Sequence, residues 1–366
     1  MQSKADVADV VIVGASATGS LAARESAKRG AKTLLLEEDQ LPGKFHKCSG
    51  LYSKRGIETL RVDYSDFLVN KIRGANIHAG KHCFTVEKKE TIAVVLDRQK
   101  LDEELCQQAV DAGAALKLDE RITKKTGAGA IASKNSEFNY KYLIGADGVA
   151  STVAYLCGFP SIGKGNIAMC YEAEFDNCDV ENNALVDVFL SSFFPGFFGW
   201  IIPSGGRKAR IGFGTTRHAA VKSAFVHFFS LPKVKQARGD EKLREFWHAI
   251  PLRTRRQTQK NNVMLVGDAA GQVKSTSGGG VVFGGQCAML AGEIAARNCA
   301  GENLNYEKMW RAKFGSVLKT HRAVRKVFDA SPSPLHKLAV IGLDKLFVGK
   351  IVEKFGDMDY IARTPC

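Results

Sequence analysis

The first apolar run of the chain is "DVVIVG" (9–14), and a glycine-containing turn, an alanine-rich segment and a second apolar run follow it. Valines and isoleucines without polar alternation indicate a strand buried on both faces, as in a parallel sheet. The segment "ASATGSLAARESAKRG" (15–30) predicts a helix, and "AKTLLLEE" (31–38) predicts a second strand. Residues 9–37 therefore predict a strand–helix–strand unit that opens a nucleotide-binding domain.

Two later apolar runs end in a glycine and an acidic residue. The run "YLIGADGVAST" (142–152) predicts a buried strand that ends near Asp147. Residues 262–297 predict a strand, the pair Gly267-Asp268, a glycine triplet at 278–280 and a helix. A carboxylate at the carboxyl edge of a parallel sheet can hold a ribose or ribityl hydroxyl. The triplet offers backbone N–H groups and a helix N-terminus to an anion or a ring carbonyl.

A third pattern, of alternating or apolar runs with frequent breaks, occupies residues 166–254. The runs "IAMCYEAEF", "ALVDVFLSS", "GFFGWIIPSG" and "KARIGFGTT" predict an antiparallel sheet, to which residues 63–97 are expected to contribute. Alternation predicts that Phe198, Trp200 and Ile202 share one face of a strand, with Phe197, Gly199 and Ile201 on the other. One face would belong to the core, and the other would wall a cavity.

The uncharged stretch 188–206 within this region is long enough to suggest a membrane span. Pro195, Pro203 and the glycines between 196 and 206 argue against a helix there. Lys4, Asp6 and Asp9 ahead of the first apolar run argue against a signal peptide or an N-terminal anchor.

Composition places the chain among globular proteins, since 45% of its 366 residues are hydrophobic and 25% are charged. The length predicts two domains of about 100–200 residues each. Nine cysteines without a C-x-x-C pair favour a reducing compartment over a disulfide framework, so we expect a cytoplasmic protein.

The net charge of +14 is compatible with nucleic acid, an anionic membrane or an acidic substrate. The basic residues are dispersed apart from "RTRRQTQK" (253–260), and no nucleic-acid-binding signature accompanies them. We therefore expect no nucleic acid partner and favour peripheral contact with the inner face of an anionic membrane. Residues 332–355 predict an amphipathic helix that would either touch headgroups or pack on the protein.

The turn after the first strand carries the clearest candidate chemistry. It reads Gly14-Ala-Ser16-Ala-Thr18-Gly19, with Ser16 in place of the middle glycine of G-x-G-x-x-G. Small residues at that position let the backbone approach a pyrophosphate. Glu37 ends the second strand, where an acidic side chain can accept hydrogen bonds from ribose hydroxyls.

Across residues 9–300 these motifs resemble the FAD-dependent oxidoreductases of the aromatic-hydroxylase superfamily. The resemblance implies an α/β fold: a Rossmann-like FAD-binding domain, an inserted antiparallel-sheet substrate domain and a helical C-terminal region. The implied bounds are 1–62, 98–165 and 255–301 for the FAD-binding domain, 63–97 and 166–254 for the substrate domain, and 302–366 for the helical region. FAD is the implied cofactor, and no metal site is expected.

The same resemblance implies roles for individual residues. The turn with Gly14, Ser16, Thr18 and Gly19 would bind the FAD pyrophosphate, and Glu37 would bind the adenosine ribose. Backbone around Ile122, on an expected strand "DERITKK", would contact adenine, and Arg98 would lie near the isoalloxazine. The remaining cofactor-binding positions are Cys48, Ser49, Gly50, Asp147, Gly267, Asp268, Gly279, Gly280 and Val281.

Two shorter stretches resemble one branch of the superfamily, the geranylgeranyl reductases. "PGFFGWIIP" (195–203) is similar to their P-x-x-Y-x-W-x-F-P signature, and "KCSGLYS" (47–53) is similar to their cysteine–glycine loop. The resemblance implies that Phe198, Trp200 and Ile202 bind the substrate. It also implies a catalytic Cys48 near the flavin, which would supply or relay a proton or gate the pocket.

The implied activity is FAD-dependent saturation of carbon–carbon double bonds in geranylgeranyl chains of membrane lipids or their precursors. No second complete dinucleotide turn occurs, so the electron donor would be external, either NAD(P)H or a ferredoxin-like protein. An alternative stays open, because F-G-W-I-I-P also resembles the W-x-W-x-I-P box of flavin-dependent halogenases. A halogenase needs a lysine between flavin and substrate, and Lys71 and Lys81 lie in no recognisable context. A hydroxylase acting on a hydrophobic substrate is the other alternative.

Overall fold

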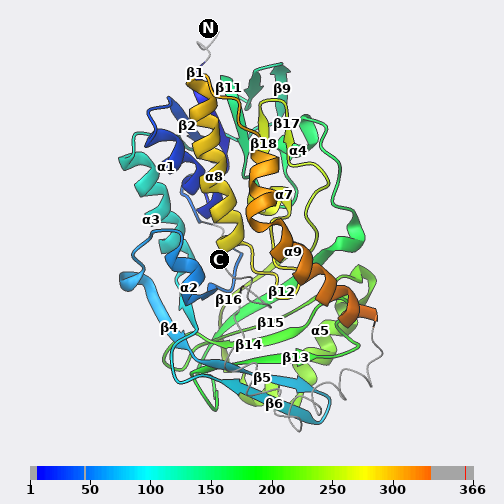
Figure 1. The fold of residues 1–366 in the computed structure, drawn as a ribbon. Coiled ribbons are helices and arrows are strands. Elements are labelled where there is room, and N and C mark those ends of the chain that lie inside the picture. The colour runs from blue at the N-terminus through cyan, green and yellow to red at the C-terminus, as the bar shows by residue number, and fades with distance from the viewer. Residues whose placement is uncertain (1–5, 45–46, 331–358, 360–366) are drawn as a thin grey trace.

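An eight-stranded sheet forms the upper half of the molecule in the computed structural model, which describes residues 6–44, 47–330 and 359 (Figure 1). Its main path runs β17-β18-β11-β1-β2-β8, and β10 and β9 extend from β11. Except at β17 and the β9–β10 hairpin, neighbouring strands are parallel. The bounds are β1 (Asp6–Val13), β2 (Thr33–Leu36), β8 (Ala115–Lys117), β9 (Lys124–Gly127), β10 (Ala130–Ala132), β11 (Glu137–Gly145), β17 (Gln259–Lys260) and β18 (Val263–Leu265).

Both faces of this sheet are covered, as the apolar runs predict. Val10 and Ile12 of β1 belong to one core, while Val11 and Val13 belong to the core on the opposite face. The first core is shared with α1 (Ala17–Ala27), α3 (Arg98–Asp111), α8 (Val281–Cys299) and α9 (Tyr306–Ala330), and the second with α4 (Thr152–Leu156). The strand–helix–strand unit predicted from residues 9–37 is therefore confirmed.

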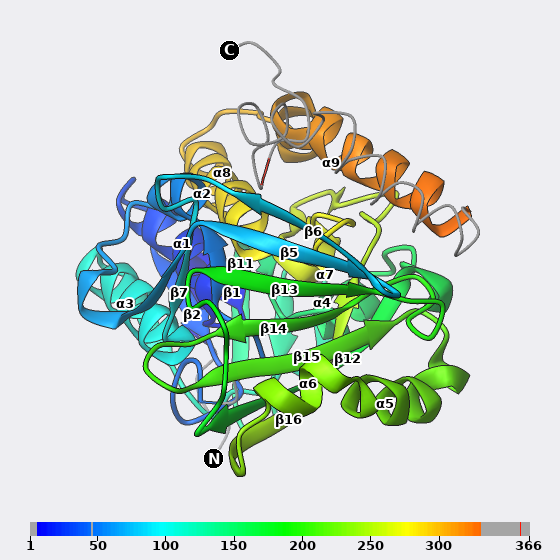
Figure 2. The ribbon, with the colours of Figure 1, turned by 90° about the horizontal axis from the view of Figure 1, so that it is seen from below.

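A seven-stranded sheet forms the other half, with the order β16-β12-β15-β14-β13-β5-β6 (Figure 2). Its neighbours are antiparallel except β13 and β5, which confirms the antiparallel pattern predicted for 166–254. One face packs on α5 (Val221–Ser230) and α6 (Pro232–Ala237). The strands are β5 (Gly74–Ala79), β6 (His82–Glu87), β12 (Ile167–Asp176), β13 (Leu185–Leu190), β14 (Gly199–Pro203), β15 (Ala209–Thr215) and β16 (Glu241–Pro251).

A small three-stranded sheet, in the order β3-β7-β4, connects the two large ones in sequence. Its strands are β3 (Leu51–Ser53), β4 (Leu68–Ile72) and β7 (Ala93–Leu96), so residues 63–97 contribute to two sheets instead of one. The remaining helical elements are α2 (Lys54–Glu58), α7 (Gly267–Ala270) and the 3₁₀ turns η1 (Ser65–Phe67), η2 (Lys164–Asn166) and η3 (His218–Ala220). The α/β architecture with an inserted sheet and a C-terminal helix is confirmed, while the domain bounds stay a prediction.

Two details of the predicted strands are wrong. Phe197 packs with Trp200 and Ile202, because β14 begins only at Gly199 and the turn before it, with Gly196 at φ +72°, interrupts the alternation. Ile122 lies before β9 and not on it, in the core with Val13.

The predicted amphipathic helix at 332–355 lies outside the described residues. Among the helices that the structure describes, none combines the length and apolar character needed to cross a membrane.

Candidate active site

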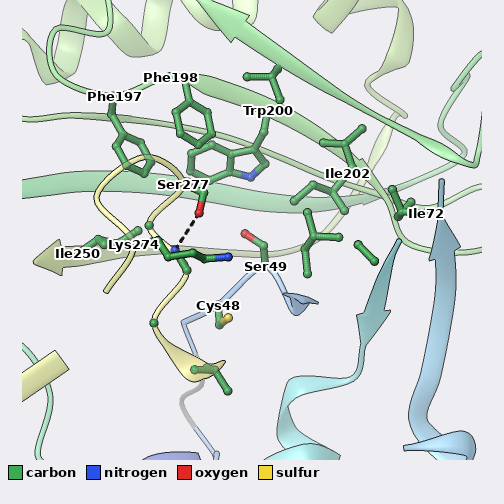
Figure 3. A pocket seen from close by; sticks show the side chains of 18 of the residues that line it. Cys48, Ser49, Ile72, Phe197, Phe198, Trp200, Ile202, Ile250, Lys274 and Ser277 are labelled. Atoms are coloured by element: carbon green, nitrogen blue, oxygen red, sulfur yellow. Dashed lines mark hydrogen bonds between the residues drawn. The ribbon is translucent and has the colours of Figure 1, made fainter. Parts of the chain in front are cut away.

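A cavity of roughly 700 Å³ is lined by residues of the seven-stranded and three-stranded sheets, by loops between elements and by the first residues of α3, α7 and α8. Three segments meet there: the inner face of the seven-stranded sheet, the loop before β3 and the loop between α7 and α8 (Figure 3). The predicted site residues that line it are Cys48, Ser49, Arg98, Phe198, Trp200, Ile202, Asp268, Gly279, Gly280 and Val281.

The wall contributed by the seven-stranded sheet is apolar. Trp200 and Ile202 point from β14 into the cavity, and Val186 and Val188 from β13 join them. The rings of Phe197 and Phe198 are stacked, with centroids 4.4 Å apart. Such a surface favours an apolar ligand, since its contact removes hydrocarbon from water.

Trp200 carries a polar contact on this apolar wall. Its indole Nε1 donates a 2.8 Å hydrogen bond to Oε2 of Glu172, which lies on β12 and is 1% exposed. The hydroxyl of Ser49 donates to the same oxygen. Burial raises the pKa of the Glu172 carboxyl, against the effect of the Ser49 hydrogen bond and the Arg210 charge.

An arginine fixes the loop that carries Cys48 and Ser49. Arg210 donates from Nη1 to the Ser49 carbonyl oxygen at 2.5 Å and pairs through Nε with Glu174 at 3.1 Å. Gly50 has φ +66°, and a Cβ there would clash with the Leu96 carbonyl and the Arg210 guanidinium. The Cys48 sulfur accepts the Gly50 N–H at 3.4 Å and lies 3.6 Å from the Tyr52 hydroxyl.

On the side of the first sheet, the cavity ends at Asp268 and Arg98. Burial raises the pKa of Asp268 to about 6, although the Arg98 charge acts in the opposite direction. Arg98 pairs with Asp102 at 3.0 Å, and the other oxygen of Asp102 accepts the Ala17 N–H at 2.8 Å. Asp102 therefore links the cavity to the N-terminus of α1.

The predicted dinucleotide turn lies next to this cavity wall. Gly14 has φ +98°, and a Cβ there would lie 2.6 Å from the Ala146 carbonyl oxygen. Glu37 reaches back from the end of β2, and its Oε2 accepts the Ala15 N–H at 2.7 Å. Ser16 is the N-cap of α1 but makes no capping hydrogen bond with its side chain.

Several predicted residues do not line the cavity: Gly14, Ser16, Thr18, Gly19, Glu37, Gly50, Ile122, Asp147 and Gly267. Gly267 and Thr18 bring the two cofactor motifs together, since a Cβ at Gly267 would lie 2.8 Å from Thr18 Cγ2. Asp147 accepts hydrogen bonds from Ser151 Oγ at 2.5 Å and Val153 N at 2.9 Å, so it holds the start of α4, whose N-cap is Ser151. Its role in cofactor binding stays a prediction.

Sequence patterns did not identify four polar residues of this region. The i,i+4 spacing of Asp102 from Arg98 is a signal that could have identified Asp102. Glu172 and His248 lie on strands for which the sequence did not show which face turns inward. Lys274 stands in the flavin-loop motif; it lines the cavity and pairs with Asp359. The halogenase candidates Lys71 and Lys81 are exposed and lie outside the cavity lining.

These features fit FAD. The glycine turn keeps side-chain bulk from the N-terminus of α1, as a pyrophosphate requires, and Glu37 stands beside that turn for the ribose. Gly279 and Gly280 open the cavity ahead of α8, where a flavin ring needs close backbone approach. The fold and the site define an FAD-dependent oxidoreductase. The model of the FAD binding domain family matches residues 7–302, and the chain belongs to this family.

Relatives in sequence span nearly the whole chain. A Methanocaldococcus jannaschii protein named only as uncharacterized is 31% identical over 362 residues, covering 96% of this chain and 92% of that protein. The digeranylgeranylglycerophospholipid reductase 2 of Methanothermobacter thermautotrophicus is 27% identical over 343 residues, covering 88% of each chain. The Methanocaldococcus jannaschii digeranylgeranylglycerophospholipid reductase is 29% identical over 390 aligned positions, covering 95% of this chain and 96% of that protein.

Solved structures share the fold. A geranylgeranyl bacteriochlorophyll reductase-like protein from Thermoplasma acidophilum superposes with a TM-score of 0.83 at 22% identity, covering 96% of this chain and all of that one. The flavin-dependent brominase Bmp2 superposes with a TM-score of 0.74 at 18% identity, covering 97% and 94% of the two chains. At these identities the likeness concerns the fold alone.

Proposed function

We propose that this protein is an FAD-dependent reductase that saturates carbon–carbon double bonds in geranylgeranyl chains of membrane lipids or their precursors. The observation that carries the proposal is the cavity itself. An apolar wall with Trp200 and Ile202 faces loops that carry Cys48, Gly280 and Val281, which match the flavin motifs. An isoprenoid chain offers no polar handle at its double bonds, so its binding relies on apolar contact and exclusion of water.

The names of the relatives support the substrate class. Reductases named for digeranylgeranylglycerophospholipid match this chain at 27% to 29% identity over nearly its whole length. The cavity agrees with that class, because its wall on the seven-stranded sheet is apolar and offers a hydrocarbon chain contact away from water.

In this proposal some residues bind the cofactor and others bind the substrate. The turn of Gly14, Ser16 and Gly19 holds the pyrophosphate, and Glu37 holds the adenosine ribose. When bound and reduced, FAD supplies a hydride. Phe198, Trp200 and Ile202 orient the isoprenoid, and Cys48 contacts it near the reacting carbons. Orientation of this kind lowers the entropic part of the barrier.

The test is anaerobic reoxidation of the reduced, FAD-loaded protein by a geranylgeranyl glycerophospholipid. The proposal expects recovery of the oxidised flavin spectrum with the unsaturated lipid and none with the fully saturated phytanyl lipid as matched control. A flavin that stays reduced with both lipids contradicts the proposal.

Halogenation is a second candidate function, because a halogenase needs a lysine between flavin and substrate and Lys274 lines the cavity. Its pairing with Asp359 favours a structural role. Oxygen-dependent incorporation of halide into a hydrophobic substrate would select this alternative.

Electron supply and membrane contact complete the proposal. The reductant is external, either NAD(P)H or a ferredoxin-like protein, and the basic chain contacts an anionic membrane surface peripherally to reach its lipid. Sedimentation with anionic vesicles, compared with neutral ones, tests the second part.

A further inference from the structure

Glu172 is a buried acid that lies behind the apolar wall of the cavity. It is 1% exposed on β12, and its Oε2 receives hydrogen bonds from Trp200 Nε1 and the Ser49 hydroxyl. Both donors line the cavity, although Glu172 itself does not. A single buried carboxyl thus stands behind two groups that face the substrate space.

The surroundings of Glu172 disfavour its charged form. Its Oε1 is buried without a hydrogen-bond partner among the described residues, and a buried ionised oxygen left unpaired is costly. The charges of Arg210 and Arg244 favour the ionised form of Glu172 but do not outweigh its burial, and both arginines form ion pairs with Glu174, at 3.1 Å and 2.7 Å. Burial accordingly raises the pKa of Glu172. Glu172 therefore keeps its proton to a higher pH than an exposed glutamate does.

Ser49 lies between Glu172 and the cavity, because its hydroxyl is hydrogen-bonded to Glu172 and the residue lines the cavity. Its backbone is fixed by the hydrogen bond from Arg210 to its carbonyl oxygen, and its hydroxyl is directed toward the Trp200 side of the cavity (Figure 3). The neighbouring Cys48 sulfur instead contacts Gly50 N and the Tyr52 hydroxyl within its own loop. Of these two cavity residues, only Ser49 touches the buried acid.

We propose that Ser49 delivers the proton that completes double-bond reduction and that Glu172 replaces it through their shared hydrogen bond. This inference rests on the proposed function. The hydride from reduced flavin forms a C–H bond at one alkene carbon as the π bond breaks, and the Ser49 proton forms the second at the other carbon. When Glu172 is protonated on Oε2, the contact runs from that O–H to Ser49 Oγ, which leaves the Ser49 hydrogen for the cavity. Glu172 passes its proton to Ser49 as Ser49 gives up its own, and water that enters the cavity after product release returns a proton to Glu172 through Ser49. The external two-electron donor reduces the oxidised flavin again.

The decisive variants are Glu172→Gln and Ser49→Ala in the FAD-loaded protein. The amide oxygen introduced by Glu172→Gln can still accept from Ser49 and Trp200, but the amide holds no acidic proton. Lipid-dependent reoxidation is expected to fall by about 100-fold or more in both variants, the range for a lost general acid. Ser49→Thr, which keeps the hydroxyl, is expected to retain most of the rate. Glu245→Gln on β16 is the matched control, because this acid is exposed and outside the cavity.

An infrared measurement tests the reservoir independently of turnover. The resting protein at neutral pH is expected to show a carbonyl stretching band of a protonated carboxylic acid that shifts in D₂O. The band should vanish in Glu172→Gln and persist in Glu245→Gln.

The outcomes separate this inference from the proposed function. Wild-type rates in FAD-loaded Glu172→Gln and Ser49→Ala, or a missing infrared band, overturn the proton route while lipid reduction by the wild type stands. No lipid reduction by the wild type overturns the function and the proton route together. If Glu172→Gln loses FAD, the rates of Ser49→Ala and Ser49→Thr test the proton route instead. Equal rates in these two variants overturn it.

Discussion

The Trp200 indole packs directly against Gly212, its partner across the β14–β15 ladder. A Cβ at Gly212 would lie 2.6 Å from Cζ2 of Trp200, closer than any real Cβ contact allows. The glycine therefore determines where the indole lies on the cavity wall and lets its N–H reach Glu172.

Gly212→Ala is expected to displace the indole and to lower the thermal midpoint, because the added Cβ would also lie 2.5 Å from the Tyr171 carbonyl oxygen. The rate of lipid-dependent flavin reoxidation per FAD-loaded molecule is expected to fall with the displacement of the indole. Gly165→Ala is the matched control, because a Cβ at Gly165 meets no atom within 4 Å. Flavin content, thermal midpoint and reoxidation rate are measured on the same preparations. Equal rates in the two variants would show that the indole position is unimportant for substrate.

Glu37→Ala is expected to weaken FAD binding, because it removes the carboxylate that we propose accepts the ribose hydroxyls, and a hydrogen bond to a charged group contributes about 1.5–3 kcal/mol. Glu38→Ala provides the control, since Glu38 is exposed and its ion pair with the exposed Arg121 is of a kind that contributes little. Fluorescence titration of the stripped proteins with FAD gives both affinities. Identical affinities would place the ribose elsewhere.

A pH dependence follows from Asp268, whose pKa burial raises from 3.8 to about 6. The folded FAD-free protein then binds more protons than the unfolded chain between pH 4 and 6, so the contribution of Asp268 to stability falls as pH rises through that window. The stability difference between wild type and Asp268→Asn should shift by about 1.4 kcal/mol per pH unit there, in favour of the variant at higher pH. Urea titrations of both stripped proteins at several pH values measure it. A difference that does not change with pH would contradict a raised pKa.

Local patterns in the sequence were sufficient for the nucleotide-binding half. The strand run at 9–14, its glycine turn and Glu37 are close in sequence, and backbone geometry places them together in the structure. The strands of the antiparallel half were predictable from the sequence, but the packing of their side chains was not. Alternation puts Phe197 on the wrong face, because it holds only inside a strand and β14 begins two residues later.

Glu172 shows what periodicity alone could not provide. In "IAMCYEAEF" the alternation puts Cys170, Glu172 and Glu174 on one face, which a single sheet would turn to solvent. Here that face is covered by residues of the three-stranded sheet, and Ser49 comes from a segment more than a hundred residues away in sequence. Only the tertiary structure identifies the acid as buried and next to the cavity.

The central claim, reduction of isoprenoid double bonds, is tested most directly by the mass of the lipid product. Purified protein loaded with FAD and reduced by dithionite is incubated with a geranylgeranyl glycerophospholipid, with and without oxygen and halide, and the extracted lipid is analysed by mass spectrometry. The account predicts a product that gains one pair of hydrogens per double bond, without oxygen and without halide. Lipid that gains oxygen or halide, or that returns unchanged from the reduced protein, would contradict it.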